Sequence, residues 1–246
     1  MAISQSPSFD LFGEQHLLVM SIILALTIGI PYFVKKAHSE QVTQMVALSL
    51  ASILMLAKVC EPIYRILSGR TWLTVLPLHL CDIGGFLICI MLINRNYFLY
   101  ELAYFWALGG TVQAVLTPDL IEGYSTIDFL IYFVVHGLII ISVIYATVVF
   151  KYRPTLKSIW RTFLTTLLYT LVIIPVNLLL NTNFLYICRK PKNPSLLDYL
   201  GPWPWYVLSL AIIAPVIFFI YYSPFWISDL LRAHNRGNFR NKIEKS

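Results

Sequence analysis

The chain has 246 residues, of which 58% are hydrophobic and 12% are charged, and its formal net charge is +6. Soluble domains contain about 25% charged residues, so the composition excludes a soluble fold, which would lack the polar surface to cover its core. The excess of Lys and Arg is better explained by cytoplasmic segments beside a membrane than by nucleic-acid binding. We predict a polytopic membrane protein of the all-α class, with one domain over residues 1–246.

The chain contains seven apolar segments that meet the length of a transmembrane helix, roughly 20 residues. They run approximately over residues 15–34, 43–67, 72–93, 97–117, 126–150, 157–181 and 204–227. The N-terminal region carries Asp10 and Glu14 but no Lys or Arg before the first segment, so we expect no cleavable signal peptide.

The orientation follows from the distribution of Lys and Arg, which gather in cytoplasmic segments. With the N-terminus outside, twelve lie in inside segments: Lys35, Lys36, Arg95, Lys151, Arg153, Lys157, Arg161, Arg232, Arg236, Arg240, Lys242 and Lys245. Four lie in outside segments: Arg70, Arg189, Lys190 and Lys192. This asymmetry predicts an N-out, C-in arrangement.

Polar side chains of five predicted spans fall at a similar depth, towards the outer side. His136, for example, lies about 15 Å below the outer end of its span at ~1.5 Å per residue. The others are Glu61, Arg65, His79, Cys81, Gln113, Thr117, Asn177 and Asn181. The inner halves are largely Leu, Ile, Val and Phe. The sequence therefore predicts a polar pocket in the outer half of the bundle.

A thiol, an imidazole and a carboxylate occur within four positions of an otherwise apolar stretch, at His79, Cys81 and Asp82. Ionisable groups at membrane depth are costly and usually functional. Pro77 interrupts a helix, and if a new helix begins near it, Cys81 lies at the positive helix end, which favours the thiolate. We interpret Cys81 as a nucleophile, although a free cysteine often acts only as a small apolar residue.

His136 is the expected base for Cys81, because a Cys–His pair activates the thiol. The competing interpretation is a hydrogen-bonded packing histidine. His79 is a second candidate base or a donor to the substrate. It lies two positions from Cys81, so the two would point about 200° apart on a regular helix. It lies three positions from Asp82, which it can meet.

Three charged residues, Lys58, Glu61 and Arg65, share one helical stripe. They are either a mutually neutralising set or a substrate site in which Glu61 holds Arg65 and Arg65 receives a lipid phosphate. Gln113 follows two glycines suited to close helix packing, and its buried amide needs partners.

The longest polar loop follows the sixth predicted span and contains Arg189, Lys190 and the run Pro202-Trp203-Pro204-Trp205. It either anchors the last span with its aromatic residues or covers the pocket, with the two basic side chains meeting phosphates. Asn177, at the end of the preceding span, is a further candidate for substrate binding.

Together these residues resemble the YwaF-like bacterial integral membrane proteins, which are related to eukaryotic transmembrane protein 164. The resemblance covers about residues 61–206. It rests on the segment 76–81, the segment from Trp106 to Asp119, the span that contains His136, and the segment from Lys190 to Tyr206.

The resemblance implies a cysteine-dependent phospholipid acyltransferase, a multi-pass protein of the bacterial cytoplasmic membrane. Cys81 would accept the acyl group and His136 would be its partner, with phospholipid and lysophospholipid as substrates and no cofactor or metal. Three alternatives stay open: a transporter or proton-coupled carrier, a metal site built from His79, Cys81, Asp82 and His136, and a non-catalytic membrane scaffold.

Overall fold

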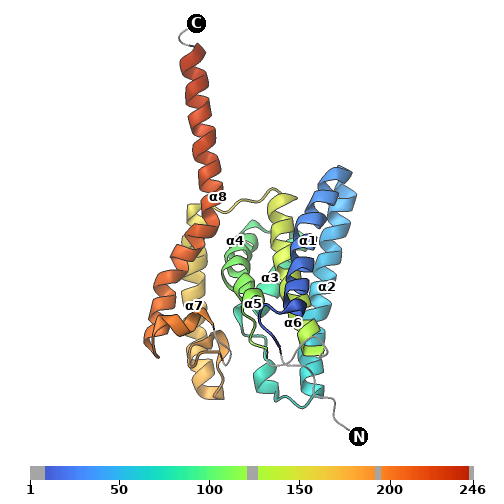
Figure 1. The fold of residues 1–246 in the computed structure, drawn as a ribbon, viewed down its shortest axis with the longest axis vertical. Helices are drawn as coiled ribbons and strands as arrows, with labels where there is room; N and C mark the ends of the chain where they lie inside the picture. The colour runs from blue at the N-terminus through green and yellow to red at the C-terminus, as the bar shows by residue number, and fades with distance from the viewer. Residues whose placement is uncertain (1–8, 121–126, 192–194, 244–246) are drawn as a thin grey trace.

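The computed structural model describes residues 9–120, 127–191 and 195–243, and every regular element within them is helical. Most of the long helices lie along one common direction, and the C-terminal part of α8 (Trp205–Ile243) extends beyond one end of the bundle (Figure 1). Lys192, Lys245 and the first residue of the predicted fifth span, Thr126, lie outside the described residues.

Twelve helical elements follow one another along the described chain. They are α1 (Glu14–Ala37), α2 (Glu40–Leu67), η1 (Trp72–Val75), α3 (Leu80–Asn94), α4 (Tyr97–Trp106), η2 (Ala107–Thr111), α5 (Val112–Leu116), α6 (Ile127–Val148), α7 (Leu156–Leu180), η3 (Phe184–Tyr186), η4 (Leu196–Leu200) and α8 (Trp205–Ile243).

Five of the described helices are long and apolar enough to cross a membrane: α1, α2, α6, α7 and the part of α8 from Trp205 to His234. They agree with the first, second, fifth, sixth and seventh predicted spans. Their exposed surfaces are apolar, because side chains such as Leu168, Leu178 and Leu179 point outwards. The protein is therefore an all-helical membrane protein.

The predicted third span, residues 72–93, is divided in the region where an interruption by Pro77 was expected. Residues 72–75 form the short 3-10 helix η1, and α3 begins only at Leu80. Pro77 explains the break, because a residue before proline is pushed out of the helical region, and Leu76 is extended at φ −57° and ψ 131°. At ~1.5 Å per residue α3 is about 22 Å long, shorter than the roughly 30 Å hydrocarbon core.

The predicted fourth span, 97–117, is helical from Tyr97 to Leu116 but is divided into three parts. The π-helical segment η2 separates α4 from α5. Such wide turns are rare and are often found at functional sites. Gly109 allows α8 to approach η2, since a Cβ there would lie 3.3 Å from the ring of Phe218.

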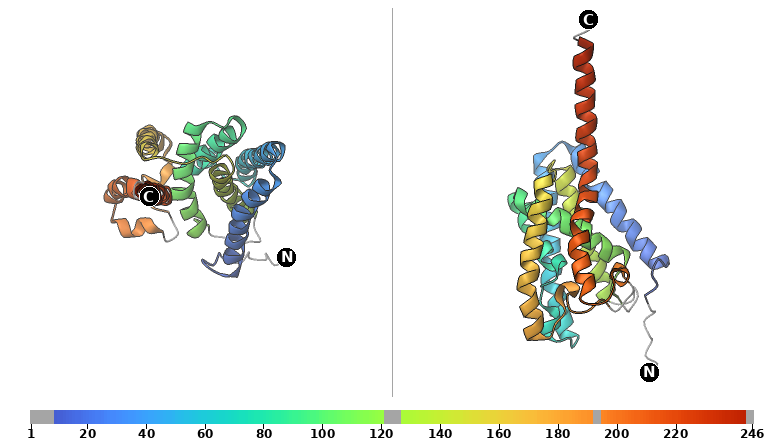
Figure 2. Two further views of the ribbon diagram at one scale, coloured as in Figure 1. Left: turned by 90° about the horizontal axis from the view of Figure 1, so that it is seen from above. Right: turned by 90° about the vertical axis from the view of Figure 1, so that its left-hand side faces the viewer.

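The core forms where α3 packs against α2, α4 and α6. Its fully buried side chains include Leu54, Ile88, Tyr100, Phe105 and Tyr145. Helix α1 packs on the outer side of α6, while α7 and α8 pack together on the far side of α4. Figure 2 shows α7 and α8 on one side of the bundle, α1 on the other, and the C-terminal part of α8 extending beyond the bundle.

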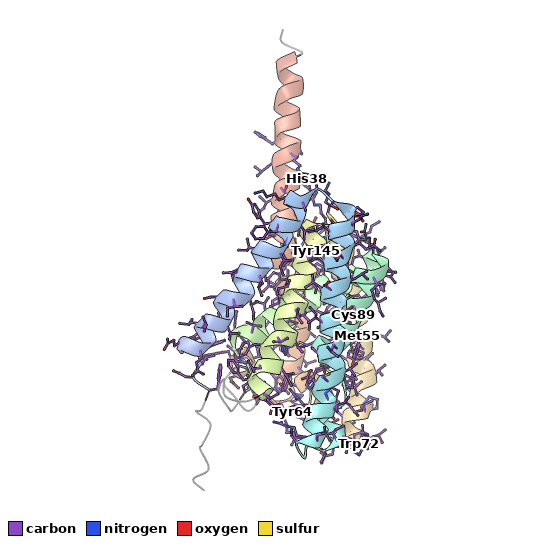
Figure 3. The ribbon with its side chains drawn as sticks, turned by 90° about the vertical axis from the view of Figure 1, so that its right-hand side faces the viewer. His38, Met55, Tyr64, Trp72, Cys89 and Tyr145 are labelled. Atoms are coloured by element: carbon purple, nitrogen blue, oxygen red, sulfur yellow. The ribbon has the colours of Figure 1, made fainter. Side chains whose placement is uncertain are left out.

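The two ends of the bundle are formed by different segments of the chain. Figure 3 shows His38 at one end and Tyr64 and Trp72 at the other. Four segments lie at the end near Trp72: the C-terminus of α2, the start of α3, the start of α6 and the loop between α7 and α8. The predicted polar pocket residues accordingly come from segments that converge on the Trp72 end.

Candidate functional site

The first turn of α3 presents Cys81. His79 is the residue before the helix and has extended backbone angles, φ −74° and ψ 153°. Its backbone N–H donates to Oδ2 of Asp82 at 3.2 Å, which is half of the reciprocal arrangement that starts many helices. Cys81 is thus the second residue of α3, near the positive end of the helix dipole.

The thiol of Cys81 lies against the π-helical segment. Its Sγ is 3.5 Å from Oγ1 of Thr111, the last residue of η2. Thr111 is buried, whereas Cys81 remains partly exposed. The wide turn therefore places a buried hydroxyl beside the thiol, which packs against the edge of the hydrophobic core.

The imidazole of His136, on α6, has a defined tautomer. Its Nδ1 lies 2.7 Å from the backbone oxygen of Tyr132, and its ring stacks on the Tyr132 ring at a centroid distance of 4.1 Å. Because a carbonyl oxygen only accepts, Nδ1 carries the hydrogen in the neutral ring and Nε2 keeps its lone pair. This is the form that a general base requires.

Cys81 and His136 come from helices that pack against each other, but no hydrogen bond joins them in the described residues. His136 stacks on Tyr132, whose hydroxyl donates to the backbone oxygen of Ala114 at 2.9 Å. Cys81 contacts Thr111, three residues before Ala114. The imidazole and the thiol are thus both linked to the segment 111–114. Hydrogen bonds of catalytic groups are often long before substrate binds.

A chain of ion pairs crosses this region between α2, α3 and α6. Nζ of Lys58 lies 2.5 Å from Oδ1 of Asp82 and 3.6 Å from Oε2 of Glu61. Glu61 in turn pairs with Arg65 at 2.9 Å. Asp128 lies 3.9 Å from Nε of Arg65 and 3.1 Å from a guanidinium nitrogen of Arg70, where the chain ends. Lys58 is 4% exposed, so these are paired charges in a largely buried place, as their cost requires.

Gly85 makes room for this ion-pair chain. A Cβ built on Gly85 would lie 3.0 Å from Cε of Lys58. The stem of Lys58 therefore runs directly over the backbone of α3. The second glycine of the pair, Gly84, is in ordinary contact with Trp106.

The ring of His79 packs against the loop that follows α7. It lies 5.5 Å from the ring of Phe184 and 5.4 Å from the ring of Tyr186. It lines two hollows. One has a volume of about 80 Å³ and is walled by the ion-pair residues of α2 and by Pro77. The other has a volume of about 470 Å³ and opens beside Arg189.

The loop between α7 and α8 covers this end of the bundle. The hydroxyl of Tyr186 donates to Oδ2 of Asp119 at 3.2 Å, and the hydroxyl of Tyr206 donates to the backbone oxygen of Tyr186 at 2.6 Å. Burial and the Asp119 carboxylate raise the pKa of Tyr186, and Cys81 contributes in the same direction. Tyr186 thus stays neutral, and its hydroxyl ties the loop to Asp119.

The other predicted substrate-binding residues are placed as follows. Gln113 donates to Oγ1 of Thr117 at 2.9 Å within its own segment. Asn177 is buried, and its amide bonds the backbone of Phe184, which ties the loop to α7. Lys190 pairs with Asp198 at 3.9 Å and lies over the ring of Tyr206. Arg189 is exposed beside the 470 Å³ hollow.

The metal-site alternative finds no support in the described part of the chain, where no three His, Cys, Asp or Glu side chains are grouped to hold a metal ion. Asp82 is paired with Lys58, and the His79 ring contacts Phe184 and Tyr186. Its four proposed ligands thus have other partners or face other directions.

Four contacting residues were not identified from the sequence as site residues: Thr111, Asp119, Tyr132 and Tyr186. Thr111 and Asp119 lie in the segment from Trp106 to Asp119, which also contains the two glycines and Gln113. Tyr132 lies one helical turn before His136, a spacing that predicts contact. Only Tyr186 carried no signal, because loop aromatics suit the membrane interface equally well.

Fold and site together define a helical membrane protein with a partly exposed thiol at the start of an interrupted helix. Residues 11–222 match the TMEM164 family, and the chain belongs to it. This confirms the resemblance seen in the sequence. An uncharacterized protein from Treponema pallidum (strain Nichols) is 24% identical over 220 residues, which cover 88% of this chain and 90% of that protein. No solved structure matches the chain.

Proposed function

We propose that the protein transfers a fatty acyl chain between glycerophospholipids through a thioester on Cys81, with His136 as the base. The observation that carries the proposal is the placement of Cys81 at the second residue of α3, partly exposed and 3.5 Å from the Thr111 hydroxyl. A thiol at a helix N-terminus is favoured as the nucleophilic thiolate. Family membership supports the proposal as well.

The reaction has two half-reactions. In the first, Nε2 of His136 takes the proton of Cys81, Sγ attacks an ester carbonyl of a diacyl lipid, and the carbon–oxygen bond to glycerol breaks. The imidazolium returns the proton to the leaving glycerol oxygen, so a lysophospholipid departs. In the second, His136 takes the proton of an acceptor hydroxyl, which attacks the thioester, and the proton ends on the released thiol. This is a ping-pong scheme.

Substrate binding is assigned to the polar residues around the thiol. Nε of Arg65 is buried and has no hydrogen-bond partner among the described residues. Its N–H, 3.9 Å from the Asp128 carboxylate, is assigned to donate to a lipid phosphate. Arg189, at the mouth of the 470 Å³ hollow, is a second donor. Glu61 and Asp82 orient the basic groups, while Asn177 and Lys190 fix the covering loop. Gln113 or His79 is assigned to the developing oxyanion.

For the membrane arrangement we propose seven crossings, N-out and C-in, in the bacterial cytoplasmic membrane. α3 is too short to span the membrane alone. We propose that η1 and the residues between η1 and α3 complete this crossing. Non-helical backbone is tolerated at membrane depth where protein covers it. Here Tyr169 of α7 donates to the backbone oxygen of Leu78 at 2.8 Å.

The proposal is tested by reconstituting the full chain in phosphatidylcholine vesicles with an isotope-labelled diacyl donor and an unlabelled lysophospholipid. Cys81→Ala and Cys81→Ser are expected to abolish label transfer, and intact-mass spectrometry is expected to find an acyl adduct on the wild-type chain only. Cys60→Ala is the matched control, because Cys60 is exposed on α2. Full acyl exchange by both Cys81 variants would refute the scheme. Label released as free fatty acid without an acceptor would identify hydrolysis.

The buried ion-pair chain favours a second candidate, a transporter or proton-coupled carrier. It links α2, α3 and α6 through alternating charges that continue from Asp128 to Arg70, near the end of the bundle. Buried charges in transporters mark ion and proton pathways. Flux measurements in proteoliposomes separate the two candidates, because a carrier moves solute or protons without changing the lipid composition.

A further inference from the structure

A groove of about 620 Å³ lies between α1 and α6, away from Cys81. Figure 3 places one of its lining residues, His38, at the opposite end of the bundle from Trp72. The full lining is Thr27, Ile28, Pro31, Tyr32, Lys35, Lys36, His38, Ile144 and Val148. Its volume lies within the roughly 300–1,000 Å³ range of binding pockets.

The groove follows from how the two helices cross. They are closest near Gly137, where a Cβ would lie 3.0 Å from Cγ1 of Ile23. Beyond this crossing, Ile144 and Val148 follow on α6 at about 10 and 16 Å along the axis. They are only partly buried. The space between the helices thus has apolar walls and runs along the direction that a lipid chain takes in a membrane.

The mouth of the groove is basic and unneutralised. Lys35 and Lys36 are exposed, and among the described residues neither has an ion-pair partner. No carboxylate lines the groove. Three arginines at the same end differ from these two lysines because each forms an ion pair. Arg95 pairs with Glu40, Arg153 with Asp229 and Arg161 with Glu101.

We propose that this groove binds an anionic phospholipid, with one acyl chain between α1 and α6 and its phosphate against Lys35 and Lys36. Basic pockets between membrane helices on one side of a bilayer are suited to acidic head groups. The apolar length of the groove requires a chain as well as a charge, which points to a lipid and not to a free phosphate. The site is separate from Cys81 and does not depend on the proposed acyl transfer.

The experiment is native mass spectrometry of the full chain after incubation with equal amounts of phosphatidylglycerol and phosphatidylcholine that carry the same acyl chains. The wild-type chain is expected to retain phosphatidylglycerol preferentially. Lys35→Ala/Lys36→Ala is expected to weaken that retention about thirtyfold, at roughly 1 kcal/mol for each lysine. Ile144→Trp, which fills the groove, is expected to lose both lipids while keeping the lysines.

Lys157→Ala is the matched control, because Lys157 is exposed at the same end but does not line the groove. It should retain phosphatidylglycerol as the wild type does, and Lys35→Arg/Lys36→Arg should do so too. Equal loss in the Lys157 control would overturn the site in favour of a diffuse basic surface. Displacement of the bound lipid by free glycerol phosphate would overturn the lipid assignment. Unchanged retention in Ile144→Trp would overturn the groove as the binding place.

Discussion

The side chain of Lys58 neutralises two carboxylates in a place from which solvent is almost excluded. It is paired with Asp82 and Glu61. Removing one partner of such a pair leaves an uncompensated buried charge, which costs about 3–5 kcal/mol. We therefore expect Lys58→Met to lower the free energy of unfolding in detergent by about that amount. Denaturant titration followed by circular dichroism measures it.

Two comparisons make the Lys58 prediction specific. Lys58→Met combined with Asp82→Asn should recover most of the lost stability, because no charge is then left without its partner. Arg95→Met should cost only about 0–1 kcal/mol, because Arg95 and Glu40 form an exposed pair. Additive losses for Lys58 and Asp82 would show that the two do not act as a pair.

His136 is expected to act on the reaction and not on the fold. Its Nδ1 bond to the Tyr132 backbone fixes the ring, and Nε2 carries the lone pair. General base catalysis contributes typically 10²–10⁴-fold, so His136→Gln should slow acyl transfer by about that factor and leave the unfolding midpoint nearly unchanged. Initial rates with the labelled donor test this. A wild-type rate in His136→Gln would assign the residue to packing.

At the scale of helices, the crossing of α1 and α6 includes a close approach at Gly137. The missing side chain of Gly137 leaves room for Ile23, whose Cγ1 and Cδ1 would lie 3.0 and 3.2 Å from an added Cβ. Ile is stiff at χ1, so Gly137→Ala should lower the unfolding free energy by about 1–3 kcal/mol. Gly110→Ala is the control, because an added Cβ there meets nothing within 4 Å. A loss in both variants would point to glycine flexibility instead of the crossing.

The helix boundaries that follow from local chemistry were predictable. Pro77 implied a new helix near Cys81, and α3 begins at Leu80. Hydropathy alone makes residues 72–93 one apolar segment, and only the proline marks the backbone break within it. The division of the fourth span was not predicted. A π segment at Ala107–Thr111 has no residue signature and depends on packing against α8.

The long-range contacts at the site were harder to predict from the sequence than the helix boundaries. The depth of the polar residues predicted one shared end, and the segments that carry them converge there. The contact of Cys81 with Thr111 is different, since it joins residues 30 apart through a π turn. Likewise, the spacing of Glu61 and Arg65 predicted their pairing within α2, whereas the bond from Lys58 to Asp82 required the packing of α2 on α3.

For the whole molecule, the division into two ends implies an orientation that labelling can measure. The site end carries the loop of Tyr199, which is 87% exposed, and the opposite end carries exposed Lys157. In a chain whose four cysteines are replaced, Tyr199→Cys should react with a membrane-impermeant maleimide in intact cells. Lys157→Cys should react only after permeabilisation, because basic loops stay cytoplasmic. The reverse pattern would place the site on the cytoplasmic side, and labelling of both in intact cells would mean mixed insertion.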